Sequence, residues 1–413
     1  MPALGIIADD FTGAVMVAGM LETVGIACPV LFRPGAAPAA GVLIAAARTR
    51  TVPVGEALDE IAALHGALVA AGCERVAYKG CATFDSTEAG NIGPAADFLA
   101  DQAGRRPVLM SAGFPRFGAT VHQGFLFYRG RLVTESIKRL DPLTPMLDAD
   151  LARFLGRQTP HRVGLVGHLV LRQGAGTARA ALDRLAEEGA GHVLFDASDD
   201  EDVEVTAEIA EATGLPVVAS DPLIVALARR LAAGRGAPPP ALPGRGPAVV
   251  LAGSTGPVVL GQLAALAARH PVKVVDVTDP RAPEALAAEA LDWAAGQAGP
   301  FAVSTATDEA GLAASQGVHG ALGAARRAET VLGLVARGLH GRGLRRFVVA
   351  GGETSGAVVA ALGLGGARAL PEGRLGLGTC VTEGADPLWM YLKPGKLGAE
   401  DILLRAVTED GDG

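Results

Sequence analysis

Residues Val76–Pro94 read VAYKGCATFDSTEAGNIGP, and they join a strand pattern to a dense group of polar side chains. The apolar run Val76–Tyr78 is typical of a buried strand. It ends at Lys79 and passes into a turn that contains a carboxylate, hydroxyl groups, an amide and glycines. A hydrophobic core does not need these groups, so the turn is the first candidate for chemistry.

The surrounding sequence repeats this passage from an apolar run into polar residues. Apolar runs typical of strands alternate with Ala-rich amphipathic stretches typical of helices, which indicates parallel βαβ units. Residues 120–134 interrupt this rhythm and predict a β-hairpin with a turn at Arg129-Gly130. In the first half of the chain the predicted strands are Leu4–Ala8, Pro29–Phe32, Gly41–Ala45, Arg75–Tyr78, Pro107–Met110, Val163–Val166, His192–Phe195 and Pro216–Ala219.

Residues 234–246 read GRGAPPPALPGRG, a composition that predicts a linker between two domains. A second α/β alternation follows it, and residues 367–393 look richer in strands. The sequence thus predicts an α/β protein with two domains, 1–233 and 247–413, each with a mainly parallel sheet flanked by helices. The predicted elements after the linker are strands at Ala248–Leu251, Val272–Val275, Phe301–Val303 and Arg346–Val349, and helices at Ala321–His340 and Ala399–Val407.

Length and composition restrict the class of protein. A chain of 413 residues is too long for one ordinary core, and its content of 49% hydrophobic and 19% charged residues is typical of a globular protein. The net charge of −8 argues against nucleic acid or a membrane surface as partner, but it leaves room for a small anionic ligand, since local cations can override the overall field. A homo-oligomer stays open. Four scattered cysteines indicate neither a zinc site nor a disulfide framework. The N-terminus has no signal-peptide pattern, so we expect a cytoplasmic protein.

Asp9 and Asp10 stand where the first predicted strand feeds the first predicted helix. Adjacent carboxylates at a strand end can hold a hydroxylated substrate, bind Mg²⁺ or serve as a general base. The simpler alternative is that Asp10 or Thr12 only caps the helix.

The turn after Lys79 could grip a small polyhydroxy acid, because a lysine neutralises a carboxylate while Asp, Ser and Asn bond hydroxyl groups. Arg50 follows another predicted strand and suits carboxylate recognition. In the alternative interpretation the turn is exposed, and Ser86 or Thr87 caps a helix over 92–102. The candidate residues of this turn are Lys79, Asp85, Ser86, Thr87 and Asn91.

Two glycine-rich turns, Gly253–Gly256 and Gly351–Gly356, each follow a predicted strand and open a helix. Backbone N–H groups at such turns make natural anion sites, and two in one domain favour phosphate binding. A third small loop, Lys393–Gly398, precedes the last predicted helix. The chain lacks both GxxxxGK[ST] and a GxGxxG after its first strand.

Together these motifs resemble the four-carbon acid sugar kinase family, in order and over essentially the whole chain. The segment Ala8–Ala14 (ADDFTGA) is similar to that family's N-terminal signature, and Gly351–Gly356 (GGETSG) is similar to its nucleotide loop. Tyr78–Pro94, Gly124–Phe127 and Asp141–Met146 most resemble the 3-oxo-tetronate kinases within it. The resemblance implies ATP- and Mg²⁺-dependent phosphorylation of the terminal hydroxyl of a 3-oxo-tetronate. It also implies an N-terminal acid-sugar domain and a C-terminal nucleotide domain that close over a cleft.

The resemblance also implies roles for individual residues. Phosphoryl transfer also needs a carboxylate that receives the hydroxyl proton, and our own hypothesis is that Asp10 or Asp85 does so, with Asp10 preferred because it ends a central strand. The metal ligands stay unassigned. Those expected to contact ATP are Ser254, Gly351, Gly352, Glu353, Thr354 and Gly395. Those expected to face the acid sugar are Asp9, Asp10, Arg50, Lys79, Asp85, Ser86, Thr87 and Asn91.

Two segments depart from the family pattern. Pro394–Gly398 replaces a Ser-Gly-Asn-Phe-Gly type loop, and Ser111–Pro115 differs from the usual Pro-Ala-Phe-Pro. The departures leave room for a related acid such as D-threonate, D-erythronate or a branched 3-oxo acid. An NAD-dependent hydroxy-acid oxidoreductase and a non-catalytic acid-sugar-binding protein are the alternatives from other classes.

Overall fold

The computed structural model describes residues 1–35, 38–141, 143–232, 240, 242, 246–253 and 256–408. Its contacts divide the chain into two compact units. The first contains Met1–Asp9, Val24–Cys28 and Pro34–Ala237; the second contains Asp10–Thr23, Pro29–Arg33 and Pro238–Gly413. Most of the predicted linker, 234–246, lies outside the described residues.

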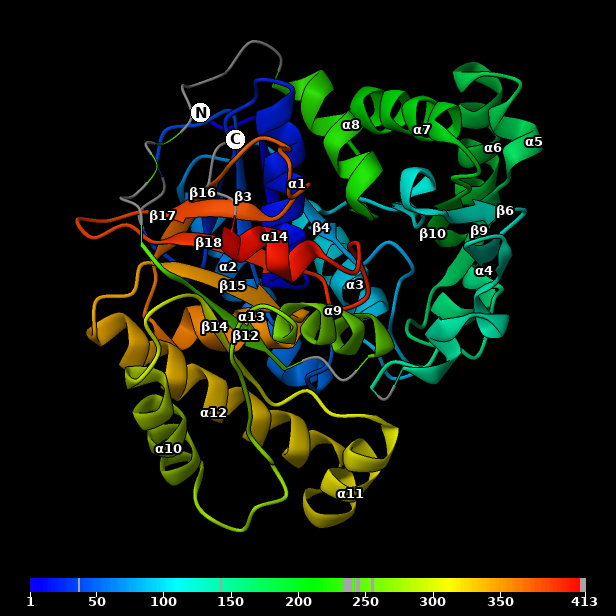
Figure 1. The fold of residues 1–413 in the computed structure, drawn as a ribbon. Coiled ribbons are helices and arrows are strands. Elements are labelled where there is room, and N and C mark those ends of the chain that lie inside the picture. The colour runs from blue at the N-terminus through cyan, green and yellow to red at the C-terminus, as the bar shows by residue number, and fades with distance from the viewer. Residues whose placement is uncertain are drawn as a thin grey trace. The chain divides into compact units, whose positions relative to one another are not determined.

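The sheet of the first unit consists of parallel strands in the order β3-β1-β4-β11-β5-β10-β9. Figure 1 labels β3, β4, β9 and β10 among them. Its central strands are buried along almost their whole length, as strands covered on both faces must be. This confirms the strands predicted in this region. The strands are β1 (Leu4–Ala8), β3 (Val42–Ala46), β4 (Val76–Lys79), β5 (Val108–Ser111), β9 (Arg162–Val166), β10 (Ala190–Phe195) and β11 (Val217–Ala219).

Two groups of helices pack onto this sheet: α2 contacts α3, while α6, α7 and α8 contact one another in series. The helices are α2 (Val54–Ala70), α3 (Ile92–Ala103), α4 (Leu151–Leu155), α5 (His168–Leu171), α6 (Ala175–Glu187), α7 (Asp200–Thr213) and α8 (Asp221–Leu231). The predicted hairpin is confirmed and gains a third strand: β6 (Ala119–His122), β7 (Phe125–Tyr128) and β8 (Arg131–Leu132) form a small antiparallel sheet. Short 3₁₀ turns follow at Val133–Glu135 and Ile137–Leu140, after an earlier one at Pro115–Phe117.

The sheet of the second unit is mixed, in the order β13-β14-β12-β15-β18-β17-β16-β2. Pairing is parallel from β13 to β18 and antiparallel from β18 to β2, which confirms that residues 367–393 are rich in strands. The strands are β2 (Pro29–Leu31), β12 (Ala248–Ala252), β13 (Val272–Val274), β14 (Phe301–Ser304), β15 (Arg346–Ala350), β16 (Gly366–Ala369), β17 (Thr379–Thr382) and β18 (Trp389–Lys393).

The helices of the second unit form its outer layers. They are α1 (Phe11–Thr23), α9 (Pro257–Ala267), α10 (Pro283–Ala295), α11 (Glu309–His319), α12 (Ala321–Gly341), α13 (Gly352–Ala361) and α14 (Ile402–Thr408). Helix α12 packs against α10 and α13, and α1 packs against α13. Although α1 and β2 come early in the sequence, both therefore build the second unit.

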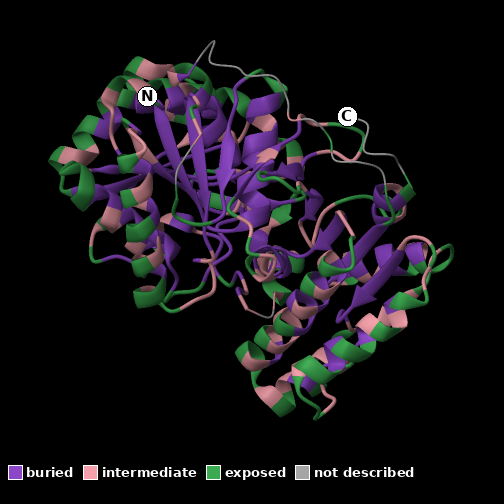
Figure 2. Ribbon diagram, turned by 90° about the vertical axis from the view of Figure 1, so that its left-hand side faces the viewer, coloured by how far each residue is buried: buried purple, intermediate pink, exposed green. Residues whose placement is uncertain are grey.

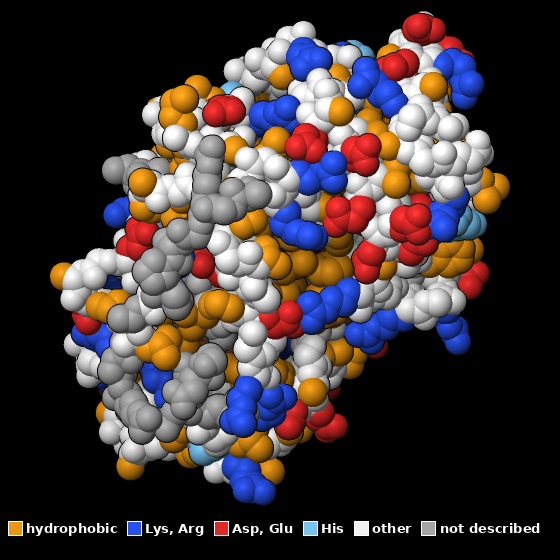
Figure 3. Space-filling model, turned by 90° about the horizontal axis from the view of Figure 1, so that it is seen from above, with side chains coloured by type: hydrophobic (Ala, Val, Ile, Leu, Met, Phe, Trp, Pro, Cys, Tyr) orange, Lys and Arg blue, Asp and Glu red, His pale blue; other side chains and the backbone are white. Residues whose placement is uncertain are grey.

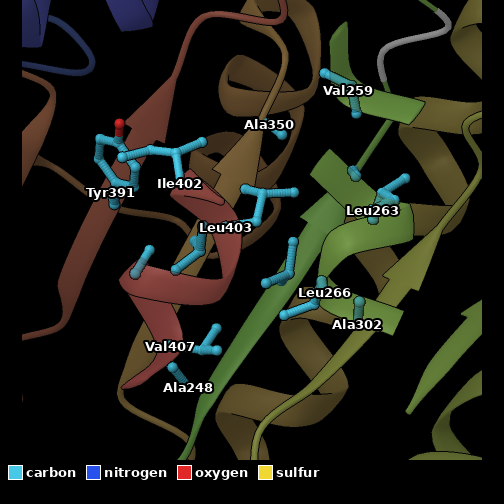
Figure 4. Close-up of a cluster of buried hydrophobic side chains, with 14 of the residues drawn as sticks. Ala248, Val259, Leu263, Leu266, Ala302, Ala350, Tyr391, Ile402, Leu403 and Val407 are labelled. Atoms are coloured by element: carbon cyan, nitrogen blue, oxygen red, sulfur yellow. The ribbon is translucent and has the colours of Figure 1, made fainter. Parts of the chain in front are cut away.

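A buried cluster between the sheet and helices α9 and α14 forms part of the core of the second unit (Figure 4). Leu263 and Leu266 of α9 meet Leu403 of α14 over Val250 and Val348 of the sheet. Truncating one such leucine to alanine would cost about 2–5 kcal/mol. Because side chains alternate across a strand, the residues on either side of Val250 face the opposite layer of helices.

Burial follows the layers, with buried strands inside and helices that expose one side (Figure 2). On the face shown in Figure 3, lysine and arginine side chains are interspersed with aspartate and glutamate side chains. No helix in the part of the chain that the structure describes is both long enough and apolar enough to cross a membrane.

Candidate functional site

Three neighbouring strands of the first unit end in charged residues. Asp9 follows β1, Lys79 is the last residue of β4, and Asp221 lies two residues beyond β11. The register aligns Ala8 with Lys79 and Lys79 with Ala219, so the three side chains lie at the same edge of the sheet. The carboxyl ends of parallel strands are the usual place for ligands in this type of fold.

Lys79 lies between two carboxylates. Its Nζ atom is 3.7 Å from Oδ1 of Asp9 and 3.6 Å from Oδ2 of Asp221. Nε of Arg50 donates a hydrogen bond of 2.8 Å to the other oxygen of Asp9. Lys79 is only 3% exposed, and such a buried ammonium needs the compensation that carboxylates provide. The structure thus brings together Asp9, Arg50 and Lys79, and it adds Asp221, which the sequence analysis missed.

Oδ1 of Asp9 is buried and accepts no hydrogen bond among the described residues. Its distance of 3.7 Å from Lys79 is too long for one. A buried carboxylate oxygen of this kind is suited to a hydroxyl group of a ligand, since an unsatisfied polar atom costs about 1–3 kcal/mol.

Asp85 lies in a second buried ion pair. Nζ of Lys138 donates a hydrogen bond of 2.6 Å to one oxygen of Asp85, and the hydroxyl of Thr83 donates one of 2.6 Å to the other. Burial alone would lower the pKa of Lys138, but the charge and hydrogen bond of Asp85 outweigh burial and raise it. Nζ of Lys138 also lies 5.4 Å from the ring centre of Tyr128, within the range of a cation–π interaction. Lys138 was not predicted from the sequence, because it lies in a 3₁₀ turn far from Asp85 along the chain.

Ser86, Thr87 and Asn91 lie in a turn fixed by hydrogen bonds. Nε2 of Gln158 donates to the hydroxyl of Ser86 at 3.1 Å and to the carbonyl of Thr87 at 2.6 Å. The side-chain amide of Asn91 donates to the carbonyl of Thr49, at 2.5 Å, and thus ties the turn to the loop after β3. The close packing of the turn also explains why residue 90 is a glycine, because an added Cβ would lie 1.8 Å from the Ser86 hydroxyl.

The two capping alternatives have different outcomes. Asn91 occupies the N-cap position of α3, so the interpretation in which Ser86 or Thr87 caps this helix is wrong. Asp10 does cap α1, because its Oδ1 accepts a hydrogen bond of 2.5 Å from the backbone N–H of Gly13.

Asp10 belongs to the second unit, whereas its neighbour Asp9 belongs to the first. A Cβ added at Gly352 would lie 3.2 Å from Oδ2 of Asp10, so the carboxylate lies against the start of α13. The hydroxyl of Thr12 donates to the hydroxyl of Ser355 at 3.2 Å, which joins the first turns of α1 and α13. Asp10 therefore lies beside the glycine-rich turn after β15.

That turn, Gly351–Thr354, combines a left-handed glycine with the open N-terminus of a helix. Gly351 has φ 126°, and Gly352, Glu353 and Thr354 form the first turn of α13. The first N–H groups of a helix have no partner within it and favour anions. Gly253, after β12, lies so close that an added Cβ would be 2.4 Å from the Thr354 hydroxyl. Ser254 lies outside the described residues.

Strands β12 and β15 are neighbours, yet their following helices diverge: α9 packs with α14, and α13 packs with α12. Such a divergence marks a topological switch point, where open α/β sheets bind ligands. Gly395 lies in the loop after β18, the other neighbour of β15. The structure thus places Gly351–Thr354 and Gly395 after adjacent strands.

Within the residues that the structure describes, no group of three His, Cys, Asp or Glu side chains is arranged to hold a metal ion.

Comparisons with known proteins indicate a different ligand for each half of the chain. A model of a sugar-binding N-terminal domain matches residues 4–227, and a model of a nucleotide-binding C-terminal domain matches residues 249–403. The chain is 39% identical to a 3-oxo-tetronate kinase of Methylobacterium radiotolerans, with 98% of both chains covered. It is 37% identical to one of Burkholderia multivorans, with 98% of this chain and 97% of the relative covered. A solved structure from Salmonella typhimurium LT2 is similar with a TM-score of 0.81 and 34% identity over 98% of both chains.

These matches define a kinase with a sugar-binding and a nucleotide-binding domain. The chain belongs to the four-carbon acid sugar kinase family. It is accordingly an ATP-dependent phosphotransferase, and the oxidoreductase and binding-protein alternatives are wrong.

Proposed function

We propose that this enzyme transfers the γ-phosphoryl group of ATP to the terminal hydroxyl of 3-oxo-tetronate and so forms 3-oxo-tetronate 4-phosphate. The observation that carries the proposal is the similarity, along the whole chain, to relatives named as 3-oxo-tetronate kinases. The charged edge of the first unit supports it, because an acid sugar carries both a carboxylate and hydroxyl groups.

In this proposal Arg50 and Lys79 bind the substrate carboxylate, and Asp9 accepts a hydrogen bond from a hydroxyl group. The three residues already form one ion-paired set with Asp221, in which only Arg50 is not fully buried. A site organised in this way before the ligand arrives loses little conformational entropy on binding. In the proposal the turn at Ser86, Thr87 and Asn91 completes the site, because Asn91 ties it to the loop that carries Arg50.

Asp10 is the proposed general base, in preference to Asp85. Both oxygens of Asp85 already accept short hydrogen bonds, one from a cationic lysine, which makes that carboxylate a poor proton acceptor. Asp10 lies beside Gly352 at the start of α13, where the proposed nucleotide loop begins. A carboxylate that receives the hydroxyl proton must lie near the transferred phosphoryl group.

The proposed nucleotide site consists of Ser254, Gly351–Thr354 and Gly395. The start of α13 fits a polyphosphate, since its first N–H groups favour negative charge. Mg²⁺ in kinases is usually held by one or two carboxylates together with phosphates and water, and Glu353, in the first turn of α13, would supply such a carboxylate. The ion, when bound, would neutralise charge on the transferred group.

Phosphoryl transfer depends mainly on positioning, so the reaction requires the acceptor hydroxyl, held by the first unit, to meet the γ-phosphate, held by the second. D-threonate, D-erythronate and a branched 3-oxo acid remain alternative acceptors. They differ from 3-oxo-tetronate in the groups that the turn after Lys79 would have to recognise.

A coupled ADP-release assay with 3-oxo-tetronate, D-threonate, D-erythronate and a branched 3-oxo acid tests the proposal. We expect the largest kcat/KM with 3-oxo-tetronate. A tenfold preference for another acid would overturn the substrate assignment. Thermal-shift measurements with ATP·Mg and NAD provide an independent check, because we expect stabilisation by ATP·Mg alone.

A further inference from the structure

Lys393 is a buried lysine at the end of β18 and lies outside the residues proposed above. Its side chain is 1% exposed, and it lies on the same face of β18 as Trp389 and Tyr391, which belong to the hydrophobic core. Lysine is almost never fully buried unless its charge is paired. This lysine therefore needs a specific explanation.

The ammonium group of Lys393 is held by two main-chain carbonyls. It donates to the carbonyl of Pro394 at 2.5 Å and to that of Leu397 at 2.7 Å. Among the described residues no carboxylate forms an ion pair with it, and burial lowers the pKa of Lys393 to about 8. An ammonium group has three N–H donors, so these carbonyls leave one donor and the net charge for a further partner.

The elements packed against β18 do not supply that partner. Their titratable side chains make no hydrogen bond or ion pair with Lys393 among the described residues. These side chains are Glu22 of α1, Arg346 of β15, Glu353 of α13 and Cys380 of β17. The positive charge is therefore not compensated within these elements of the protein.

Lys393 lies next to the proposed nucleotide loop. In the register of the sheet it pairs with Ala350, and its carbonyl accepts a hydrogen bond of 2.9 Å from the N–H of Gly351. The two carbonyls that it binds flank Gly395 in the chain. Gln262 of α9 reinforces the same loop, because its Nε2 also lies within hydrogen-bonding distance of the Leu397 carbonyl, at 3.2 Å.

We propose that Lys393 is a nucleotide-binding residue, which fixes the loop around Gly395 and places its charge beside the polyphosphate of ATP. The inference rests on the proposed nucleotide site of the second unit and adds a cationic side chain to a site whose other named residues include no lysine or arginine. It also accounts for the unusual burial, because the charge becomes paired when the anion binds.

The test compares ATP·Mg with adenosine, which has no phosphate, in isothermal titration of wild type and Lys393→Met. A charge-assisted hydrogen bond contributes about 1.5–3 kcal/mol, so we expect ATP·Mg affinity to fall about 10- to 100-fold in the variant, while adenosine affinity stays within twofold. Lys273→Met, which removes a half-buried lysine of the edge strand β13 that is paired with Glu289, is the control and should leave both affinities unchanged. An equal loss of affinity for ATP·Mg and adenosine would show that Lys393 only shapes the loop and does not act on the polyphosphate. Unchanged affinities for both ligands would show that Lys393 neither shapes the loop nor acts on the polyphosphate. Each result overturns the proposal.

A measurement on wild type alone covers the case in which Lys393→Met does not fold. Titrations with ATP·Mg at pH 8 in two buffers of different ionisation enthalpy should reveal proton uptake, because an anion beside Lys393 raises its pKa. Adenosine should cause none. Absence of uptake with ATP·Mg would overturn this inference but leave the kinase proposal intact, whereas absence of ATP binding in wild type would overturn both.

Discussion

Replacing Lys79 by Met tests the role of the charged edge of the first unit. The substitution removes the cation between Asp9 and Asp221, which lie 3.7 and 3.6 Å from it. At an effective dielectric constant of about 20, each pair contributes about 4–5 kcal/mol of Coulomb energy, much of it offset by desolvation. We expect a net loss of stability of about 3–5 kcal/mol, because both buried carboxylates lose the cation between them.

The double variant Lys79→Met/Asp221→Asn separates stability from substrate binding. Removing the negative charge of Asp221 as well should restore about 2 kcal/mol of the free energy of unfolding. This is a coupling energy within the range seen for residues in contact. It should not restore the affinity for the acid, because the cation for the substrate carboxylate is still missing. Urea unfolding measures the stability, and the KM for the acid sugar at saturating ATP measures the affinity for the acid. A double variant that regains wild-type KM would refute the proposed role of Lys79, and one that regains no stability would refute the ion-pair argument.

Three further predictions concern other parts of the two units. Asp10→Asn should lower kcat by about 10²–10⁴-fold while ATP·Mg affinity in titration stays within about threefold, and near-normal turnover in the folded variant would exclude Asp10 as base. Gly90→Ala should raise the KM for the acid but not the KM for ATP, because the added Cβ would meet the Ser86 hydroxyl at 1.8 Å. The control is Gly66→Ala, at a position of α2 where an added Cβ meets nothing within 4 Å, and it should leave both KM values unchanged. Because the pKa of Lys393 is about 8 in the folded chain and 10.5 in the unfolded chain, the unfolded chain binds one more proton than the folded chain between these pH values. The free energy of unfolding of the wild type, measured with urea, should therefore rise with pH over that range by up to about 3 kcal/mol more than that of Lys393→Met.

Much of the fold could be predicted from the sequence because most strands carry long apolar runs. The Val76–Tyr78 run predicts β4, and the polar residues after several runs predict a functional edge at the carboxyl ends of the strands. Asp9 and Lys79 each follow such a run, and the structure places them in one ion pair.

What could not be predicted depends on contacts between distant residues. Lys138 lies in a 3₁₀ turn without apolar periodicity, so nothing in its local sequence indicates that it meets Asp85. Asp221 follows a strand as Asp9 does, and this position was the one available signal for it. The membership of α1 in the second unit depends on its packing against α13, which leaves no trace in its own sequence.

The central claim, that the enzyme phosphorylates the terminal hydroxyl of 3-oxo-tetronate, is tested most directly by the structure of the product. The measurement is a phosphorus–proton correlation spectrum of the material formed from 3-oxo-tetronate and ATP·Mg. We predict that the phosphorus couples to the two protons on C4, with one ADP released for each phosphate transferred. Coupling to the C2 proton, or ADP release without a phosphorylated acid, would contradict the claim.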